Sequence, residues 1–416
     1  MYRAPRGTAD ILPADQPYWR FVEDKAAAIC NLYGYRRLDT PVFEEYNLFA
    51  RTVGEGTDIV SKEMYTFEDR SGHLMALRPE GTAPVCRAYI EHGMHNLPQP
   101  VKLYYLAAIF RYERPQAGRY RQHHQFGCEA IGEADPAVDA EVIDLVWQFY
   151  RSLGLKDLTL HLNSIGCRVC RPAYLEALKD YYAGIIDSLC PDCRTRFQKN
   201  PLRLLDCKEP SCQAAAEAAP STARSLCQEC GKHHDRLQKY LLRLDVNYKF
   251  NHRLVRGLDY YTRTVFEIQT REAGAQTAIG GGGRYDNLIE DLGGKPTPAV
   301  GFGAGIERII QNLISQKIPV PSLPQPAAFV AFAGDSVRDA AFSLASDLRR
   351  AGIATIAALS SRSLKAQLKQ ADASGARYAV IVGEEELARG TVTLRDMGTS
   401  KQTSVPMAEL AARLIN

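Results

Sequence analysis

The sequence predicts an α+β protein in three parts, on three observations. Residues 101–132 are expected to form a long antiparallel hairpin, because two aromatic and aliphatic runs flank a short stretch of proline, glycine and charge. Eight of the 11 cysteines fall between Cys167 and Cys230, in a stretch that we expect to be an inserted, mostly helical module. Beyond a proline-rich linker, short apolar strands alternate with helices over about ninety residues.

Composition narrows the class of protein. A chain of 416 residues is too long for one ordinary core, so two or three domains are expected. Hydrophobic content of 45% and charged content of 24% are typical of a globular protein in water. The chain lacks an apolar run of ~20 residues and an apolar leader, so we expect no membrane partner and a cytoplasmic location. The net charge of +3 does not by itself indicate nucleic acid.

The N-terminal region predicts a helix followed by a short strand. Apolar residues recur at helical spacing from Trp19 to Leu32, and Gly34 ends the run. Residues 35–42 suit a strand, and Pro41 within them prefers a sheet edge or a strand end. Such a helix and strand suit either the protein core or a subunit interface, and composition does not decide between them.

A second hairpin is expected over residues 64–67 and 73–77, and a helix over 82–90. Glu80 and Thr82 stand where the strand gives way to the helix. A carboxylate and a hydroxyl there can accept hydrogen bonds from the ammonium group of a ligand. Alternatively they mark only a helix N-terminus, where Glu and Thr are favoured anyway.

The tip of the long hairpin is rich in charge. Five charged residues lie at or beside it: Arg111, Glu113, Arg114, Arg119 and Arg121. Paired strands can hold several cations around one point, as polyphosphate binding requires. The alternative is a solvated hairpin tip, the usual place for basic residues.

The cysteines of the inserted module are spaced as metal ligands often are. They form three CxxC pairs and two single positions: Cys167 and Cys170, Cys190 and Cys193, Cys207, Cys212, and Cys227 and Cys230. In a cytoplasmic chain this spacing favours tetrahedral zinc, and reduced buried thiols are the alternative. The pairing of CxxC units into four-ligand sites is not determined by the sequence. The module, residues 166–249, carries 14 basic and 10 acidic residues, so its charge of +4 suits contact with RNA.

Three further motifs follow the module. Residues 256–268 join a polar, aromatic turn to a strand. The run from Gly280 to Gly283 allows either close approach of a ligand or a tight connection between strands. Residues 300–308 form a glycine-rich strand that enters an amphipathic helix, where glycines would leave a flat floor for a planar base.

The C-terminal part is expected to be a small α/β domain. Prolines at 319, 321, 324 and 326 form a stiff linker before it. Its expected strands are 329–332, 355–358 and 378–382, and its expected helices are 337–350 and 363–373.

Taken together, these motifs carry a resemblance. FRYERPQAGRYRQHHQFGCE, RPEGT, RGLDYYTRTVFEI, GGGGRYD and GFGAGIERI resemble the signature set of the histidyl-tRNA synthetases, a family of class II aminoacyl-tRNA synthetases. The resemblance covers essentially the whole chain in order. RGLDYY is the most specific motif, because it separates this family from the other class II enzymes.

The resemblance implies a fold and a division into domains. The fold would be the class II antiparallel catalytic sheet flanked by helices, homodimeric through the first helix and strand, with a helical insertion module and a C-terminal α/β anticodon-binding domain. The catalytic domain would span 1–165 and 250–318, the Cys-rich module 166–249, the linker 319–326 and the anticodon-binding domain 327–416.

The resemblance also implies residue roles. Arg111 and Arg256 would be the catalytic cations at the α-phosphate, and both would also contact histidine. The remaining ATP-binding residues would be Glu113 at the adenine end, Arg119, Arg308 at the γ-phosphate, and Gly303 and Gly305 beneath the adenine. The α-amino group of histidine would be held by Glu80, Thr82 and Gln125 with Gly81 beside them, and its imidazole by Glu129, Tyr260 and Tyr261.

The substrates implied are ATP with Mg2+, L-histidine and histidine tRNA. A structural Zn2+ in the cysteine-rich insertion is also expected, although the family's chemistry does not require it.

Two alternatives remain. One is a catalytically inactive regulatory subunit of the ATP phosphoribosyltransferase of histidine biosynthesis. Against it, the chain keeps Arg256 and residues 329–416. The other is a class II enzyme for threonine, proline or glycine. RGLDYY and the spacing of Gln125 and Glu129 speak against it.

Overall fold

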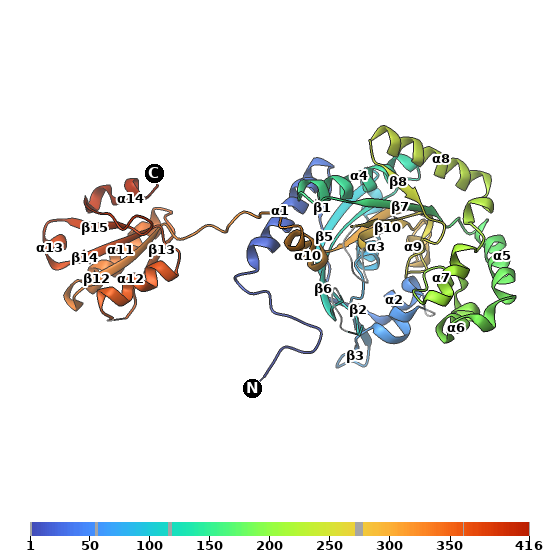
Figure 1. Ribbon diagram of the computed structural model, residues 1–416, viewed down its shortest axis with the longest axis horizontal. Coiled ribbons are helices and arrows are strands. Elements are labelled where there is room, and N and C mark those ends of the chain that lie inside the picture. The colour runs from blue at the N-terminus through green and yellow to red at the C-terminus, as the bar shows by residue number, and fades with distance from the viewer. Residues whose placement is uncertain (1, 55–56, 115–118, 271–277, 361, 416) are drawn as a thin grey trace. The chain divides into compact units, whose positions relative to one another are not determined.

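The computed structural model (Figure 1) describes residues 2–54, 57–114, 119–270, 278–360 and 362–415. The chain forms two compact units, Met1–Pro321 and Ser322–Asn416, which are described separately. Residues 115–118 of the expected hairpin tip lie outside the described ranges.

The first unit is built on an eight-stranded sheet. Its order is β1-β5-β6-β11-β10-β9-β7-β8. The six central strands are antiparallel, and a parallel strand is added at each edge. The strands are β1 (Arg36–Arg37), β5 (Val101–Phe110), β6 (Gln122–Ile131), β7 (Thr159–Ser164), β8 (Tyr248–Phe250), β9 (Thr262–Gln269), β10 (Ala278–Arg284) and β11 (Ala299–Gly305). The predicted long hairpin is therefore the β5–β6 pair, and the antiparallel catalytic sheet is confirmed.

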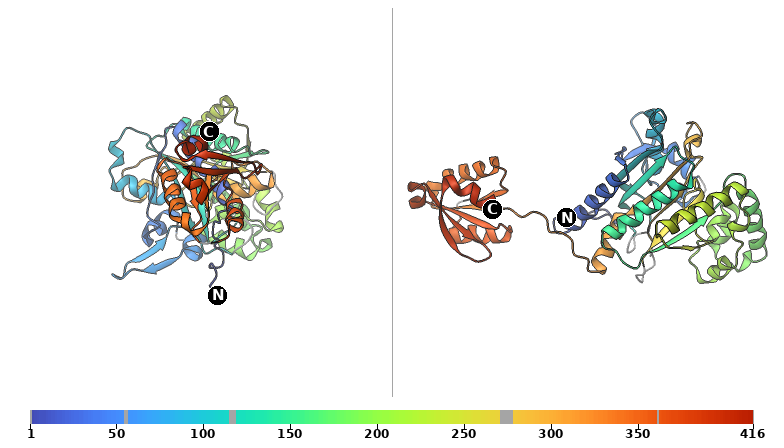
Figure 2. Two further views of the ribbon diagram at one scale, coloured as in Figure 1. Left: turned by 90° about the vertical axis from the view of Figure 1, so that its left-hand side faces the viewer. Right: turned by 90° about the horizontal axis from the view of Figure 1, so that it is seen from above.

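Helices cover both faces of this sheet. One face packs against α1 (Gln16–Leu32), α4 (Pro136–Ser152), α8 (Gln228–Arg243) and α10 (Ile306–Ser315). In the right-hand view of Figure 2, α1, α4 and α8 lie side by side, the first two in blue and teal and the third in yellow-green. The other face packs against α3 (Thr82–Glu91), α9 (Leu288–Asp291) and the first helices of the insertion. Apolar side chains are thereby buried on both sides of the sheet.

The inserted module is mostly helical, as expected. It leaves the sheet after β7, returns at β8, and forms the connection between these two parallel strands. Its helices are α5 (Arg171–Ala183), α6 (Pro191–Lys199), α7 (Pro210–Glu217) and α8, with short turns η3 (Ile186–Ser188), η4 (Pro201–Leu204) and η5 (Thr222–Arg224).

A small three-stranded sheet, β2-β4-β3, stands beside the main one. It comprises β2 (Phe43–Glu45), β3 (Thr66–Glu68) and β4 (Leu74–Leu77), so the second predicted hairpin is confirmed. The remaining elements of this region are α2 (Tyr46–Val53), the π-helical turn η1 (Ile59–Glu63) and the 3-10 turn η2 (Met94–Asn96).

The strand expected over residues 35–42 is only two residues long. Pairing with β5 continues to the N–H of Leu38, which donates to the carbonyl of Tyr104 (2.9 Å), and further along Nη1 of Arg78 donates to the carbonyls of Thr40 (2.8 Å) and Pro41 (3.1 Å). These acceptors are therefore used by a side chain, and Pro41 has no N–H to donate. Of the apolar residues at helical spacing in α1, Trp19, Val22, Ala26 and Ile29 are buried, whereas Leu32 is 81% exposed.

The second unit is the predicted α/β domain. Its five-stranded sheet has the order β13-β12-β14-β15-β16, with the first three strands parallel and the last two antiparallel. The antiparallel pair β15–β16 was not predicted. The elements are β12 (Ala328–Ala333), η6 (Asp335–Val337), α11 (Arg338–Arg350), β13 (Thr355–Ala357), α12 (Leu364–Ala373), β14 (Tyr378–Gly383), α13 (Glu384–Ala388), β15 (Thr391–Asp396), β16 (Gln402–Pro406), η7 (Met407–Glu409) and α14 (Leu410–Ile415). Within the described ranges, no helix is both long and apolar enough to cross a membrane.

Candidate active site

A row of glycines crosses the middle of the large sheet. Gly127 of β6 pairs with Gly303 of β11, which pairs with Gly281 of β10. Tyr105 and Glu267 stand at the two ends of this row on β5 and β9. Because paired residues point to the same face, three neighbouring strands carry no side chain there. The row is therefore a trough across the sheet.

The glycines are required by their neighbours. A Cβ at Gly303 would lie 1.6 Å from Nε2 of Gln125, and one at Gly127 would lie 2.3 Å from the ring of Tyr105. Both distances are far below van der Waals contact. The glycine-rich strands thus make room for the long side chains of β5 and β6.

A cavity of about 210 Å³ lies over this trough. Two larger cavities, of about 320 and 520 Å³, adjoin it, and Arg111, Glu113 and Arg119 line all three. The first cavity is lined by eight of the predicted site residues: Arg111, Glu113, Arg119, Gln125, Arg256, Gly303, Gly305 and Arg308. The cavity has room for a ligand, and its walls carry four arginines and three glutamates.

Four arginines reach this cavity from separate elements. Arg111 follows β5, and its Nε donates to the carbonyl of Pro79 (2.7 Å). Arg119 pairs with Glu113 (3.3 Å) at the hairpin. Arg308 lies in the first turn of α10, and its Nη1 donates to the carbonyl of Ala278 (3.0 Å). Anchored in this way, the guanidinium groups are held in place before an anion arrives.

Arg256 is the fourth arginine, from the loop before β9. Its Nη1 donates to Oε2 of Glu267 (2.8 Å), while Nε is buried with no hydrogen-bond partner among the described residues. A Cβ at Gly281 would lie 2.8 Å from Nη1, so the guanidinium rests directly on the glycine row. Arg256 therefore keeps an unused donor at the floor of the cavity.

His123 lines the same cavity and was not predicted. Burial, with Arg111 and Arg308 nearby, lowers its pKa to about 3, so the imidazole is neutral at neutral pH. It is two residues before Gln125 on β6 and faces the same side. Alternation along that strand was the signal that could have identified it.

The remaining predicted residues form a buried group further along the same face. Oε1 of Glu129 accepts from the hydroxyl of Thr82 (2.8 Å) and Oε2 from the hydroxyl of Tyr285 (2.5 Å). Burial raises the pKa of Glu129 to about 8. Tyr105 lies within 3.5 Å of the same carboxylate. Tyr105 and Tyr285 are contacts that sequence analysis missed.

Glu80 stands at the start of α3. Its two oxygens accept from the backbone N–H groups of Thr82 (2.7 Å) and Ala83 (2.8 Å), and the hydroxyl of Tyr260 is 3.4 Å away. These are the contacts expected if Glu80 serves only as a favourable residue at the N-terminus of a helix. A carboxylate has about four acceptor positions, so a further donor from a ligand can still be accommodated. Binding of an ammonium group by Glu80 stays a prediction.

Two tyrosines and a glycine complete this group. The rings of Tyr260 and Tyr261 contact each other (4.8 Å between centroids), and Tyr260 also packs against Tyr285. Gly81 lies against Tyr105, since a Cβ there would be 2.4 Å from the ring. Glu80, Gly81, Thr82, Glu129, Tyr260 and Tyr261 do not line the first cavity. The sheet brings the predicted residues together in two neighbouring groups, joined by Gln125 and Glu129 on one strand.

A buried ion-pair network supports the edge of the site. Nε of Arg284, at the end of β10, donates to Asp139 of α4 (2.8 Å), which also contacts His233 of α8 (3.1 Å). Nη1 of the same arginine donates to Asp286 (2.9 Å). His233, which follows the last CxxC pair in sequence, is therefore bound to a carboxylate rather than to the cysteines.

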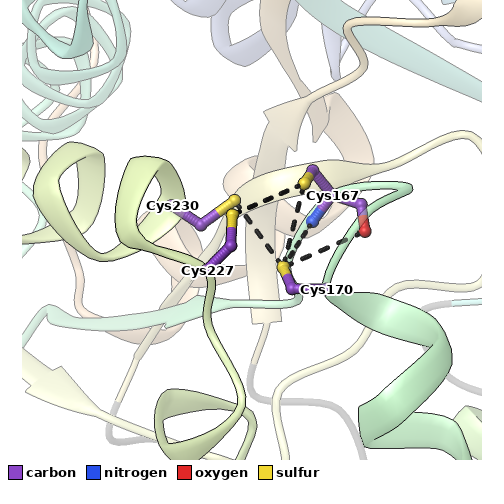
Figure 3. A group of neighbouring side chains, drawn as sticks. All are labelled: Cys167, Cys170, Cys227 and Cys230. Carbon is purple, nitrogen blue, oxygen red and sulfur yellow. Dashed lines mark hydrogen bonds between the residues drawn. The ribbon is translucent and has the colours of Figure 1, made fainter.

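The eight cysteines of the module separate into two groups. The first is Cys167, Cys170, Cys227 and Cys230 (Figure 3), and the second is Cys190, Cys193, Cys207 and Cys212. Within each group the sulfur atoms all lie within 4.8 Å of one another. All the cysteines lie in the described ranges, and they are unbridged. Either group can hold a metal ion.

Known proteins share this sequence and fold. Residues 7–309 match the family described as histidyl-tRNA synthetase, and residues 327–416 match the anticodon binding domain family. The chain is 61% identical over 414 residues to a histidine–tRNA ligase of Dehalococcoides mccartyi, which covers 100% of this chain and 99% of that relative.

Solved structures agree. The crystal structure of apo S. aureus histidyl-tRNA synthetase superposes with a TM-score of 0.84 at 37% identity, covering 100% of both chains. An ATP phosphoribosyltransferase regulatory subunit/histidyl-tRNA synthetase from Bacillus halodurans has a TM-score of 0.65 at 23% identity, covers 92% of this chain and 98% of its own, and shows the fold alone. With a family match over most of its length and a full-length relative at 61% identity, the chain belongs to the histidyl-tRNA synthetase family.

Proposed function

We propose that this chain is a histidine–tRNA ligase. It activates L-histidine with ATP to give histidyl-adenylate and pyrophosphate, and then transfers histidine to the 3′-hydroxyl of the terminal adenosine of histidine tRNA. The observation that carries the proposal is the cavity in which four arginines surround a glycine-floored trough beside a buried, carboxylate-containing pocket. The inactive regulatory-subunit alternative is not favoured, because full-length relatives named as ligases share 61% identity with the chain.

The arginines suit the first step. A carboxylate and a triphosphate repel each other, so cations are needed to hold them in line for attack on the α-phosphorus. Arg111 and Arg256 are the proposed cations at that phosphate, and Arg308 the proposed partner of the γ-phosphate. Guanidinium groups stay charged and bind oxygen atoms in pairs, which favours the pentavalent transition state.

The glycine trough suits the nucleotide base. Gly303 and Gly305 would lie under the adenine, with Glu113 at its edge and Arg119 beside the phosphates. A Cβ at Gly305 would have its nearest neighbour 3.9 Å away, so that part of the floor is open. A flat backbone surface permits the close stacking that a purine needs.

Histidine would occupy the region between Gln125 and Glu129. Gln125, Glu80 and Thr82 offer acceptors to its α-amino group, and Glu129 offers one to an imidazole N–H, with Tyr260 and Tyr261 as walls. A donor from the substrate favours the ionised form of Glu129 and lowers its raised pKa. A side chain without an N–H would bury itself against this carboxyl group without donating the further hydrogen bond that the group can accept, and the site should reject it.

Mg2+ would act on the β- and γ-phosphates and neutralise charge there. Glu113, Glu267 and Glu307 are the carboxylates that line the cavity. Each already contacts a cation or an N–H: Glu113 with Arg119, Glu267 with Arg256 and Glu307 with His124. Phosphate oxygens would therefore supply most of the ligands, as is usual for this ion.

Four further features belong to the proposal. Exposed apolar side chains at Leu32, Val42 and Phe43 support a homodimer through the first helix and the strands that follow it. The second unit would read the anticodon of histidine tRNA, and the enzyme would work in the cytoplasm. Structural zinc in the cysteine-rich module is also proposed and is argued separately below.

The test is exchange of labelled pyrophosphate into ATP, with each standard amino acid in turn and no tRNA. Histidine alone should support exchange. Arg256→Ala should reduce it by about 10²–10³-fold, because one charged donor to the transition state is lost. Histidine binding by that variant, measured by calorimetry, should be largely intact. Folded wild-type protein without exchange for any amino acid would favour the regulatory subunit.

A further inference from the structure

The two cysteine groups have the dimensions of tetrathiolate metal sites. In the first group (Figure 3), sulfur–sulfur distances are 3.8 Å for Cys167–Cys170, 3.9 Å for Cys167–Cys227 and 3.8 Å for Cys170–Cys230. In the second, Cys190 and Cys207 are also 3.8 Å apart. Four sulfur atoms at about 2.3 Å from one zinc ion form a tetrahedron with edges of about 3.8 Å. Disulfide bonding would need about 2.05 Å.

Backbone donors already point at these sulfur atoms. The N–H of Cys167 donates to Sγ of Cys170 (3.3 Å), and the N–H of Cys190 to Sγ of Cys212 (3.3 Å). Cys190 caps α6, and its sulfur accepts from the N–H of Cys193 (3.4 Å). Donors of this kind stabilise thiolates and orient metal ligands.

The alternative of reduced core thiols describes other cysteines of this chain better. Cys30 and Cys128 are 3.6 Å apart, but they form an isolated pair within the apolar core between α1 and the sheet. The grouped cysteines come from loops and helix starts, and Cys193, Cys207 and Cys212 also pack against apolar side chains of the module such as Leu178 and Leu204. Apolar packing accounts for buried thiols, but it does not by itself bring four sulfur atoms within 4.8 Å of one another twice in one module.

We propose that the module binds two structural zinc ions, one to each group of four cysteines. Each ion displaces four thiol protons and leaves a site of net charge −2. The basic side chains of the module, which carries an excess of four positive charges, would compensate this charge. This inference does not depend on aminoacylation, since metal content is measured without it.

The first site joins segments that are 60 residues apart. Cys167 and Cys170 follow β7, whereas Cys227 and Cys230 lie at the start of α8. The site therefore closes the module near its two ends. Gly166, at φ +70°, allows the turn, because a Cβ there would lie 2.8 Å from Sγ of Cys170. Arg171 directly follows Cys170 and donates to the carbonyl of Tyr261 (2.5 Å). This hydrogen bond connects the site to the proposed imidazole pocket.

The second site lies within the module, beside the catalytic cavities. Cys207 lines the 520 Å³ cavity together with Arg111 and Arg308. Asn200, in the same segment, donates to Asp259 of the RGLDYY motif (2.7 Å). An ion at this site would fix the wall that faces the nucleotide and substrate.

The first experiment is metal analysis of the full-length protein, purified without chelators under reducing conditions. Two zinc ions per chain are expected, and X-ray absorption should show four sulfur ligands around zinc. Fewer than two ions, even after incubation with zinc, or nitrogen and oxygen ligands in the spectrum, would overturn the proposal. Both measurements use the wild-type protein, so they do not depend on the folding of any variant.

The second experiment tests the pairing. The double variant C167S/C170S and the double variant C227S/C230S should each retain one zinc ion. The fourfold variant that combines them should also retain one, because all four residues belong to the same site. If Cys167 and Cys170 shared an ion with Cys190 and Cys193 instead, the fourfold variant would lose both ions. Cys30→Ser is the control and should retain two.

Discussion

At the scale of single residues, Glu129 has an unusual environment for a carboxyl group. Its pKa is raised from 4.5 to about 8, chiefly by burial. Between these two values the folded protein holds a proton that the unfolded chain has released. The unfolded state therefore binds fewer protons, and the contribution of this group to stability falls as the pH rises from about 4.5 to about 8.

Glu129→Gln should remove this pH dependence. Gln does not ionise, so the variant should gain stability relative to the wild type as the pH rises from 5 to 8.5, by about 1–3 kcal/mol. Urea unfolding at a series of pH values measures the difference, and other titrating groups cancel in the comparison. A difference between the two proteins that stays constant with pH would contradict the raised pKa. The same variant should lose histidine-dependent exchange.

Sequence analysis found the arginines of the site but not all of their neighbours, and the carboxylates Glu267 and Glu307 were not predicted as site residues. Arg111, Arg256, Gln125 and Glu129 belong to specific motifs. Tyr105 lies outside these motifs. His123 lies within the hairpin motif but was given no role, because aromatic residues in a strand are equally typical of plain core. Alternation along β6 could have identified His123, whereas identification of Tyr105 required the pairing register between strands, which depends on contacts far apart in the chain.

At the scale of elements, the end of β10 depends on the ion pair between Arg284 and Asp139. Both side chains are fully buried, and they connect β10 to α4. Burial of two charges is costly in itself, but removal of one partner leaves the other unpaired in the protein interior. Arg284 also donates to the carbonyl of Glu133, so its loss affects the turn before α4 as well.

Arg284→Met should destabilise the first unit by about 3–5 kcal/mol, since the buried Asp139 would lose its guanidinium partner. Chemical unfolding followed by tryptophan fluorescence measures this, because both tryptophans, Trp19 and Trp147, lie in the first unit. Arg37→Met is the matched control. Arg37 pairs with Asp39 at 3.1 Å, but both side chains are more than half exposed, and the change should cost less than about 0.5 kcal/mol. Equal effects of the two substitutions would refute the importance of the buried pair.

Most helices and strands were predictable from periodicity and from glycine and proline. The failures have local causes. In the second half of the expected strand 35–42, Arg78, which lies far away in sequence, binds the carbonyls of Thr40 and Pro41, and Pro41 has no N–H to donate. The strands β15 and β16 are polar on one face and short, so their sequence shows little of the apolar pattern by which strands were recognised.

At the scale of the whole molecule, the two units have separate cores. The core of the second unit contains residues from 328 to 414, and those of the first come from before residue 320. Each unit therefore has its own hydrophobic stabilisation. The division into units was expected from the prolines near residue 320, whereas the pairing of cysteines across the module was not predictable, because it depends on how four distant segments fold together.

Deletion of residues 326–416 should spare activation and impair transfer to tRNA. Pyrophosphate exchange should stay within about twofold of the full-length rate, because the cavity lies wholly in the first unit. Charging of histidine tRNA should fall by about a hundredfold or more, since each stacked base contributes about 1–3 kcal/mol. Both rates are measured on one preparation. Undiminished charging would refute the proposed anticodon role.

The connection of the module to the sheet has a consequence for the history of such chains. β7 and β8 are adjacent and parallel, with Leu160 opposite Tyr248, so the chain leaves and re-enters the sheet at neighbouring positions. The order of the other strands does not depend on the length of the inserted segment between β7 and β8. Lineages can therefore lengthen, shorten or replace this segment, with or without metal ligands, while the register that aligns the glycines of the catalytic trough is inherited unchanged.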